Sequence, residues 1–115
     1  MNVLPETLIA QSDCSVQLEF CVPADSGYVD GHFDSCKLVP AAAQLLIAAQ
    51  MAHRYLGTGA AICSAKRLKF AAPMQPDIPV RLTLERNAAK GLLAYSMRSA
   101  DGTRSFSSGT FIPAP

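Results

Sequence analysis

The chain has 115 residues, half of them hydrophobic, with 10 Lys and Arg against 9 Asp and Glu and a net charge of +1. This length predicts a single domain, residues 1–115, with one core of ordinary size. The balanced charge gives no reason to expect nucleic acid or an anionic membrane as a partner.

The cysteines and the N-terminus set two further expectations. Four cysteines without a CxxC spacing, together with two histidines, encode neither a zinc cluster nor a redox pair, so we expect no metal and free thiols. The N-terminus lacks a basic segment followed by a long apolar core, and no apolar run approaches the length that spans a bilayer. We therefore expect a cytoplasmic protein without membrane insertion.

The first half of the chain predicts one strand, a long loop and a helix. Residues 1–13 have a weak apolar pattern that supports no firm assignment, whereas residues 15–22 alternate between apolar and polar side chains, as half-buried strands do. Residues 24–39 are rich in Asp, Gly and Ser, which favours a loop. Pro40 is suited to the first helical position, and residues 41–56 favour a helix by their composition.

The second half of the chain predicts strands up to its end. Gly57 and Gly59 should end the helix, which is apolar nearly all round and needs cover on most sides. Four further strands are expected, and the Asp101-Gly102 pair is typical of a hairpin turn. The expected strands cover residues 61–71, 78–86, 91–99 and 104–112.

This order of elements predicts an α+β fold. A strand, a loop, one central helix and then a meander of about four strands can bury the helix if an antiparallel sheet curls around it. So few strands leave open sheet edges, which a second copy could pair with. We expect a dimer.

The most informative motif is Gly31-His32-Phe33, which is followed seven residues after the Phe by Pro40. With further short matches, this segment resembles the hot-dog-fold 3-hydroxyacyl thioester dehydratases, and within them most the branch of aryl polyene pigment synthesis. The likeness covers about nine tenths of the chain. The further matches are Val22-Pro-Ala-Asp25, Gln44, Leu45, Leu68-Lys-Phe70, Pro73, Pro76 and Ser107-Ser-Gly109.

The resemblance implies a hot-dog fold and the dehydration of 3-hydroxyacyl thioesters in fatty acid or polyene biosynthesis. The substrate would be carried on the phosphopantetheine of an acyl carrier protein, with no other cofactor. His32 would be the catalytic base that removes the C2 proton, and the backbone N–H of Ala41 would hold the thioester oxygen. The substrate-binding positions implied are Gly31, Phe33, Pro40, Ala41 and Leu46.

The chain departs from the family at the acid that should protonate the leaving hydroxyl. The family has Asp or Glu fourteen residues after the His, and here that position is Leu46. Gln50 and His53 lie on the same helix face but about 6 Å and about 10 Å further along, too far to replace the acid. Two smaller departures are Ala41 in place of Gly and a loop at 34–37 with fewer prolines than the family's.

Other polar residues near the motif have weaker claims to function. Asp30 and Asp34 could orient the His32 imidazole, although solvated loop carboxylates are the favoured interpretation. Cys36 is a poor acid and lacks a second base that would make it a nucleophile. Gln44 is expected to form a hydrogen bond within the core.

A basic cluster at Lys66, Arg67 and Lys69 could contact the acidic surface of an acyl carrier protein. An ordinary solvated strand face is the favoured interpretation.

Three functions remain open at this point. Because the family builds each site from the His of one subunit and the acid of the other, the chain could be the His-donating subunit of a heterodimer with another hot-dog chain. A homodimer would have two half-built sites. The alternatives are a non-catalytic subunit that stabilises or binds a dehydratase partner, and an acyl thioesterase, for which the helix offers no carboxylate to activate water.

Overall fold

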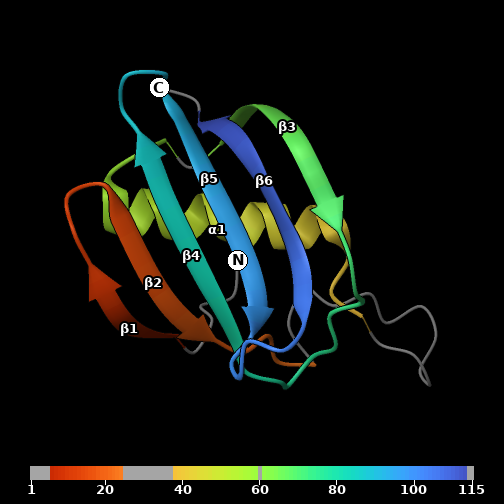
Figure 1. The fold of residues 1–115 in the computed structure, drawn as a ribbon. Helices are drawn as coiled ribbons and strands as arrows, with labels where there is room; N and C mark the ends of the chain where they lie inside the picture. The colour runs from red at the N-terminus through yellow and green to blue at the C-terminus, as the bar shows by residue number, and fades with distance from the viewer. Residues whose placement is uncertain (1–5, 25–37, 60, 114–115) are drawn as a thin grey trace.

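The computed structural model describes residues 6–24, 38–59 and 61–113, in which a helix crosses one face of a six-stranded antiparallel sheet (Figure 1). The elements in chain order are β1 (Glu6–Gln11), β2 (Ser15–Phe20), α1 (Ala41–Leu56), β3 (Ile62–Phe70), β4 (Val80–Asn87), β5 (Leu92–Ser99) and β6 (Ser105–Pro113). Across the sheet the strands follow the order β1-β2-β4-β5-β6-β3. The fold class predicted from the sequence is confirmed.

Alternation of buried and accessible side chains places three strands with one face on the core. In β2, β4 and β5 every second side chain is buried, as the apolar alternation predicts. The strand β1 shows no such alternation, because all its residues but the half-buried Glu6 are exposed at the sheet edge. This explains why the sequence of residues 6–11 supported no firm assignment.

The prediction that the last four strands form a meander is wrong for β3. β4, β5 and β6 pair in sequence order, but β3 pairs with β6 at the sheet edge and not with β4. A hairpin needs a short turn, whereas β3 and β4 are joined by residues 71–79, which contain three prolines and lead past the end of the sheet (Figure 1). β3 is therefore an edge strand.

The helix begins one residue later than predicted. Pro40 has extended backbone angles, φ −67° and ψ 158°, and so precedes the helix as its cap residue. Gly57 ends α1 with a φ of 70°, in the left-handed region that glycine adopts readily. The single chain covers one side of α1, and Leu45 and Leu46 on its flank are only partly buried.

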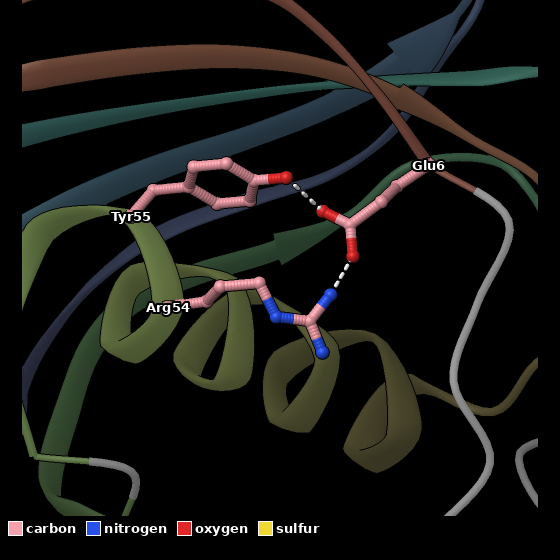
Figure 2. Close-up of polar contacts among 3 residues, drawn as sticks. All are labelled: Glu6, Arg54 and Tyr55. Carbon is pink, nitrogen blue, oxygen red and sulfur yellow. Dashed lines mark hydrogen bonds and ion pairs between the residues drawn. The ribbon is translucent and has the colours of Figure 1, made fainter.

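The far end of α1 is tied to the sheet by polar contacts. Glu6 of β1 forms an ion pair with Arg54 and accepts a hydrogen bond of 2.6 Å from the Tyr55 hydroxyl (Figure 2). Gln11, also in β1, donates to the Tyr55 carbonyl at 2.8 Å, and Arg86 of β4 donates to the Leu56 carbonyl at 3.2 Å. The contacts of Gln11 and Arg86 satisfy carbonyls at the helix end that have no partner within the helix.

Candidate functional site

A cavity of about 300 Å³ lies at the start of α1. One wall is the segment 38–41 with Gln44, and the other is the segment 70–74, which follows β3. Val39 donates a backbone hydrogen bond of 2.9 Å to the Met74 carbonyl, and this bridge joins the two walls. The cavity therefore contains Pro40 and Ala41, two of the substrate-binding positions predicted from the sequence.

The start of α1 can stabilise an anionic oxygen. The first amides of a helix have no acceptor within it, and the helix dipole adds a partial positive charge at this end. The first turn of α1 contains no acidic residue that would neutralise this potential. Ala41 is exposed and keeps the backbone N–H that a glycine would offer.

Gln44 fixes the segment that leads into the helix. Its side-chain Nε2 donates to the Val39 carbonyl at 3.0 Å, which confirms the predicted hydrogen bond within the core. The residue is buried, and its Oε1 has no hydrogen-bond partner among the described residues. Gln44 thus holds Val39, and with it the approach to Ala41, in one position.

Leu46 is half-buried and packs against the hydrophobic core. The described lining of the cavity contains no carboxylate. Proton donation to a leaving hydroxyl therefore has no candidate among the described residues of this cavity.

The predicted base lies outside the described residues. This applies to Gly31, His32 and Phe33, and also to Asp30, Asp34 and Cys36. Their roles stay predictions.

The second histidine is far from the cavity. His53 is exposed near the end of α1, and its Nδ1 lies 2.5 Å from the Thr58 carbonyl oxygen, which accepts a hydrogen bond from the ring. Twelve residues separate it from Ala41, or about 18 Å along the helix axis. Gln50, half-buried, lies between them.

The edge strand β3 borders the cavity. Phe70, which lines the cavity, is 47% exposed, and Leu68 is 37% exposed. The basic residues Lys66, Arg67 and Lys69 are exposed along the same strand. Leu68-Lys-Phe70 and Pro73 contribute to the resemblance to the dehydratase family, but the sequence did not predict that this segment forms a cavity wall.

The Ser107-Ser-Gly109 match lies on β6, in the interior of the sheet. Ser107 is buried, as is Tyr95 on the neighbouring strand β5. Burial raises the pKa of the Tyr95 hydroxyl, and the nearby Ser107 hydroxyl offsets part of that effect. Ser107 thus places a polar group in the core rather than in the cavity.

Six antiparallel strands along one helix, with a cavity at the helix start, define a protein of the hot-dog fold. A family model described as the ApeI dehydratase matches residues 8–110. The chain belongs to this ApeI-like dehydratase family. No curated protein sequence matches the chain significantly.

Solved structures share the fold of this chain. The dehydratase heterocomplex ApeI:P from Xenorhabdus doucetiae is similar with a TM-score of 0.84 and 21% identity, over 99% of this chain and 100% of that one. An uncharacterized protein from Erwinia carotovora subsp. atroseptica has a TM-score of 0.78 and 29% identity, over 99% and 98% of the two chains. The E. coli PaaI protein shares the fold alone, with a TM-score of 0.64 and 12% identity over 96% and 80%.

Among the described residues, no helix combines the length and the hydropathy that crossing a bilayer requires.

Proposed function

We propose that this chain is the His-donating subunit of a hot-dog heterodimer that dehydrates 3-hydroxyacyl thioesters on an acyl carrier protein, in fatty acid or polyene biosynthesis. The observation that carries the proposal is Leu46, a residue that cannot transfer a proton, at the acid position of a chain in a dehydratase family. The heterocomplex from X. doucetiae supports it, because that solved relative is itself a complex of unlike chains.

The proposed chemistry divides the reaction between two chains. His32 takes the C2 proton of the substrate, and an Asp or Glu of the partner protonates the departing C3 hydroxyl. The Ala41 N–H at the start of α1 stabilises the negative charge that develops on the thioester oxygen. A mixed dimer then has one complete site, because the second site combines the partner's His with Leu46.

The position of β3 suits such a partner. This strand is the sheet edge next to the cavity, and its Leu68 and Phe70 expose apolar surface there. An edge strand offers unpaired backbone groups to another strand. Covering exposed apolar side chains with a partner lowers the free energy of the complex. A partner that pairs with β3 would bring its own helix near Phe70 and the cavity.

The test compares two histidine variants in the mixed complex. We expect H32A to lower the rate of enoyl thioester formation about 10²–10⁴-fold, as the loss of a general base does. The matched control H53A removes the exposed histidine at the far end of α1 and should leave the rate within a factor of two. Analytical ultracentrifugation checks that both variants still assemble. An unchanged rate in assembled H32A complex would leave the non-catalytic subunit as the function.

A further inference from the structure

A second cavity, of about 370 Å³, lies on the sheet face that points away from α1. It is formed by β2, β4, β5 and the turn from β5 to β6, where Arg81 and Thr83 of β4 point outward between the buried Val80, Leu82 and Leu84. Figure 1 looks onto this face, with α1 behind the sheet. The cavity is therefore on the opposite side of the sheet from the helix and is separate from the site proposed above.

Two arginines lie directly opposite each other in this cavity. Arg81 of β4 pairs in register with Arg98 of β5, and like charges in such a cross-strand pair destabilise a sheet. The next outward-facing pair along the same strands is Thr83 and Ser96, which shows that small neutral side chains fit this face. The juxtaposition of Arg81 and Arg98 therefore does not itself stabilise the sheet.

The two guanidinium groups are incompletely neutralised. Glu19 of β2 contacts Nη2 of Arg81 at 3.3 Å, whereas Arg98 has no ion pair among the described residues. The Nε of Arg81 is buried and lacks an acceptor within the described part of the chain. Solvent does not reach this Nε, so a ligand in the cavity would bind the outer guanidinium N–H groups, and the exposed Arg98 offers its donors without a competing ion pair among the described residues.

The other carboxylate at the cavity belongs to the turn. Oδ1 of Asp101 accepts hydrogen bonds from the Ser99 hydroxyl at 2.6 Å and from the Thr103 hydroxyl and N–H at 2.8 and 3.0 Å. These contacts engage Oδ1 of Asp101 within its own turn, although Asp101 is also one of the residues that line the cavity. The hydroxyls of Thr83 and Ser96 and the amide of Gln17 line the remaining wall and can donate to an anion.

We propose that this cavity binds the phosphate group of a small ligand, with the guanidinium groups of Arg81 and Arg98 donating to its oxygens and Thr83 and Ser96 completing the site. Guanidinium groups bind phosphate through paired hydrogen bonds, and Arg98 has no ion-pair partner among the described residues with which the phosphate would compete. The volume lies in the range of small-molecule sites. The proposal does not depend on the dehydratase function, because neither its residues nor its test involve His32 or the cavity at α1.

The first test is a thermal unfolding titration of the intact chain with inorganic phosphate, against sodium chloride of equal ionic strength. At ten times the dissociation constant, phosphate should raise Tm by about 6 °C above the chloride control. AMP and 4′-phosphopantetheine are titrated in parallel. If either binds more tightly than inorganic phosphate, the phosphate group belongs to a larger ligand. If they bind no more tightly than inorganic phosphate, free phosphate is the ligand. A Tm that responds to phosphate no more than to chloride would overturn the proposal.

The second test compares R98Q and R81Q with R104Q. Arg104 is exposed near the same turn but does not line the cavity. Both cavity variants should lose most of the phosphate response, while R104Q keeps it, and R98Q in phosphate-free buffer should be at least as stable as the unmodified chain because the like-charge pair is gone. Equal responses in all three variants would contradict the proposal.

A measurement on the unmodified chain covers the case in which a variant does not fold. Phenylglyoxal labelling followed by peptide mapping should show that phosphate protects Arg81 and Arg98 but not Arg104. Equal labelling with and without phosphate would overturn the proposal.

Discussion

Among single residues, Gln44 lines the cavity at α1, whereas Leu46 stands at the position where the family resemblance implies an acid. Leu46 packs partly into the core and offers no proton, and Gln44 holds Val39 through its side-chain amide. The start of the helix is thus prepared to hold an oxygen atom, while the described lining lacks a group that protonates a leaving hydroxyl.

Asp101 makes a residue-level prediction about pH. Hydrogen bonds from Ser99 and Thr103 lower its pKa from 3.8 to about 2. Because the folded-state pKa is depressed, the stabilisation is fully present above about pH 4 and is lost as the pH falls towards 2. The variant D101N should have a lower Tm at pH 7 and a smaller loss of Tm between pH 4 and 2.

The check is a series of thermal unfolding curves from pH 7 to 2, with D13N as the control for loss of an exposed carboxylate in another turn. If the Tm of D101N falls as steeply below pH 4 as that of the unmodified chain, the turn contacts do not account for the acid sensitivity.

At the level of elements, the strands differ in how well the sequence predicts them. β2, β4 and β5 each bury one face, so their apolar alternation predicts them directly. β1 has mostly exposed side chains, and contacts of Glu6 and Gln11 with the end of α1 hold it in place. Such contacts join residues more than forty positions apart and leave no periodic pattern in the sequence.

The attachment of β1 can be tested at Glu6. E6Q removes the ion pair with Arg54 and weakens the hydrogen bond from Tyr55, so we expect the free energy of unfolding to fall by about 1 kcal/mol. Hydrogen exchange should become faster in β1 than in β4. The control E85Q changes an exposed glutamate of β4. If E6Q and E85Q exchange alike in β1, the Glu6 contacts do not hold this strand.

For the whole molecule, the sequence predicted the fold class and the helix but not the partner of β3. Pro73, Pro76 and Pro79 correctly mark a connection, yet local sequence does not reveal which distant strand an edge strand joins. Of the predicted substrate-binding positions, Pro40 and Ala41 line the cavity and Leu46 does not, and their roles in binding stay predictions. The segment 70–74 went unassigned because β3 and α1 are brought together only by tertiary packing.

The proposed division of one site between two chains is the central claim about the whole molecule. Turnover assays of separate and mixed chains test this claim most directly. Enoyl thioester formation from a 3-hydroxyacyl carrier protein is measured with three samples: this chain alone, a second hot-dog chain with its Asp or Glu intact, and the co-expressed complex of the two. We expect no turnover by this chain alone. The complex should form product, and its rate should depend both on His32 and on the partner's acid. Turnover by this chain alone at a normal enzymatic rate would contradict it.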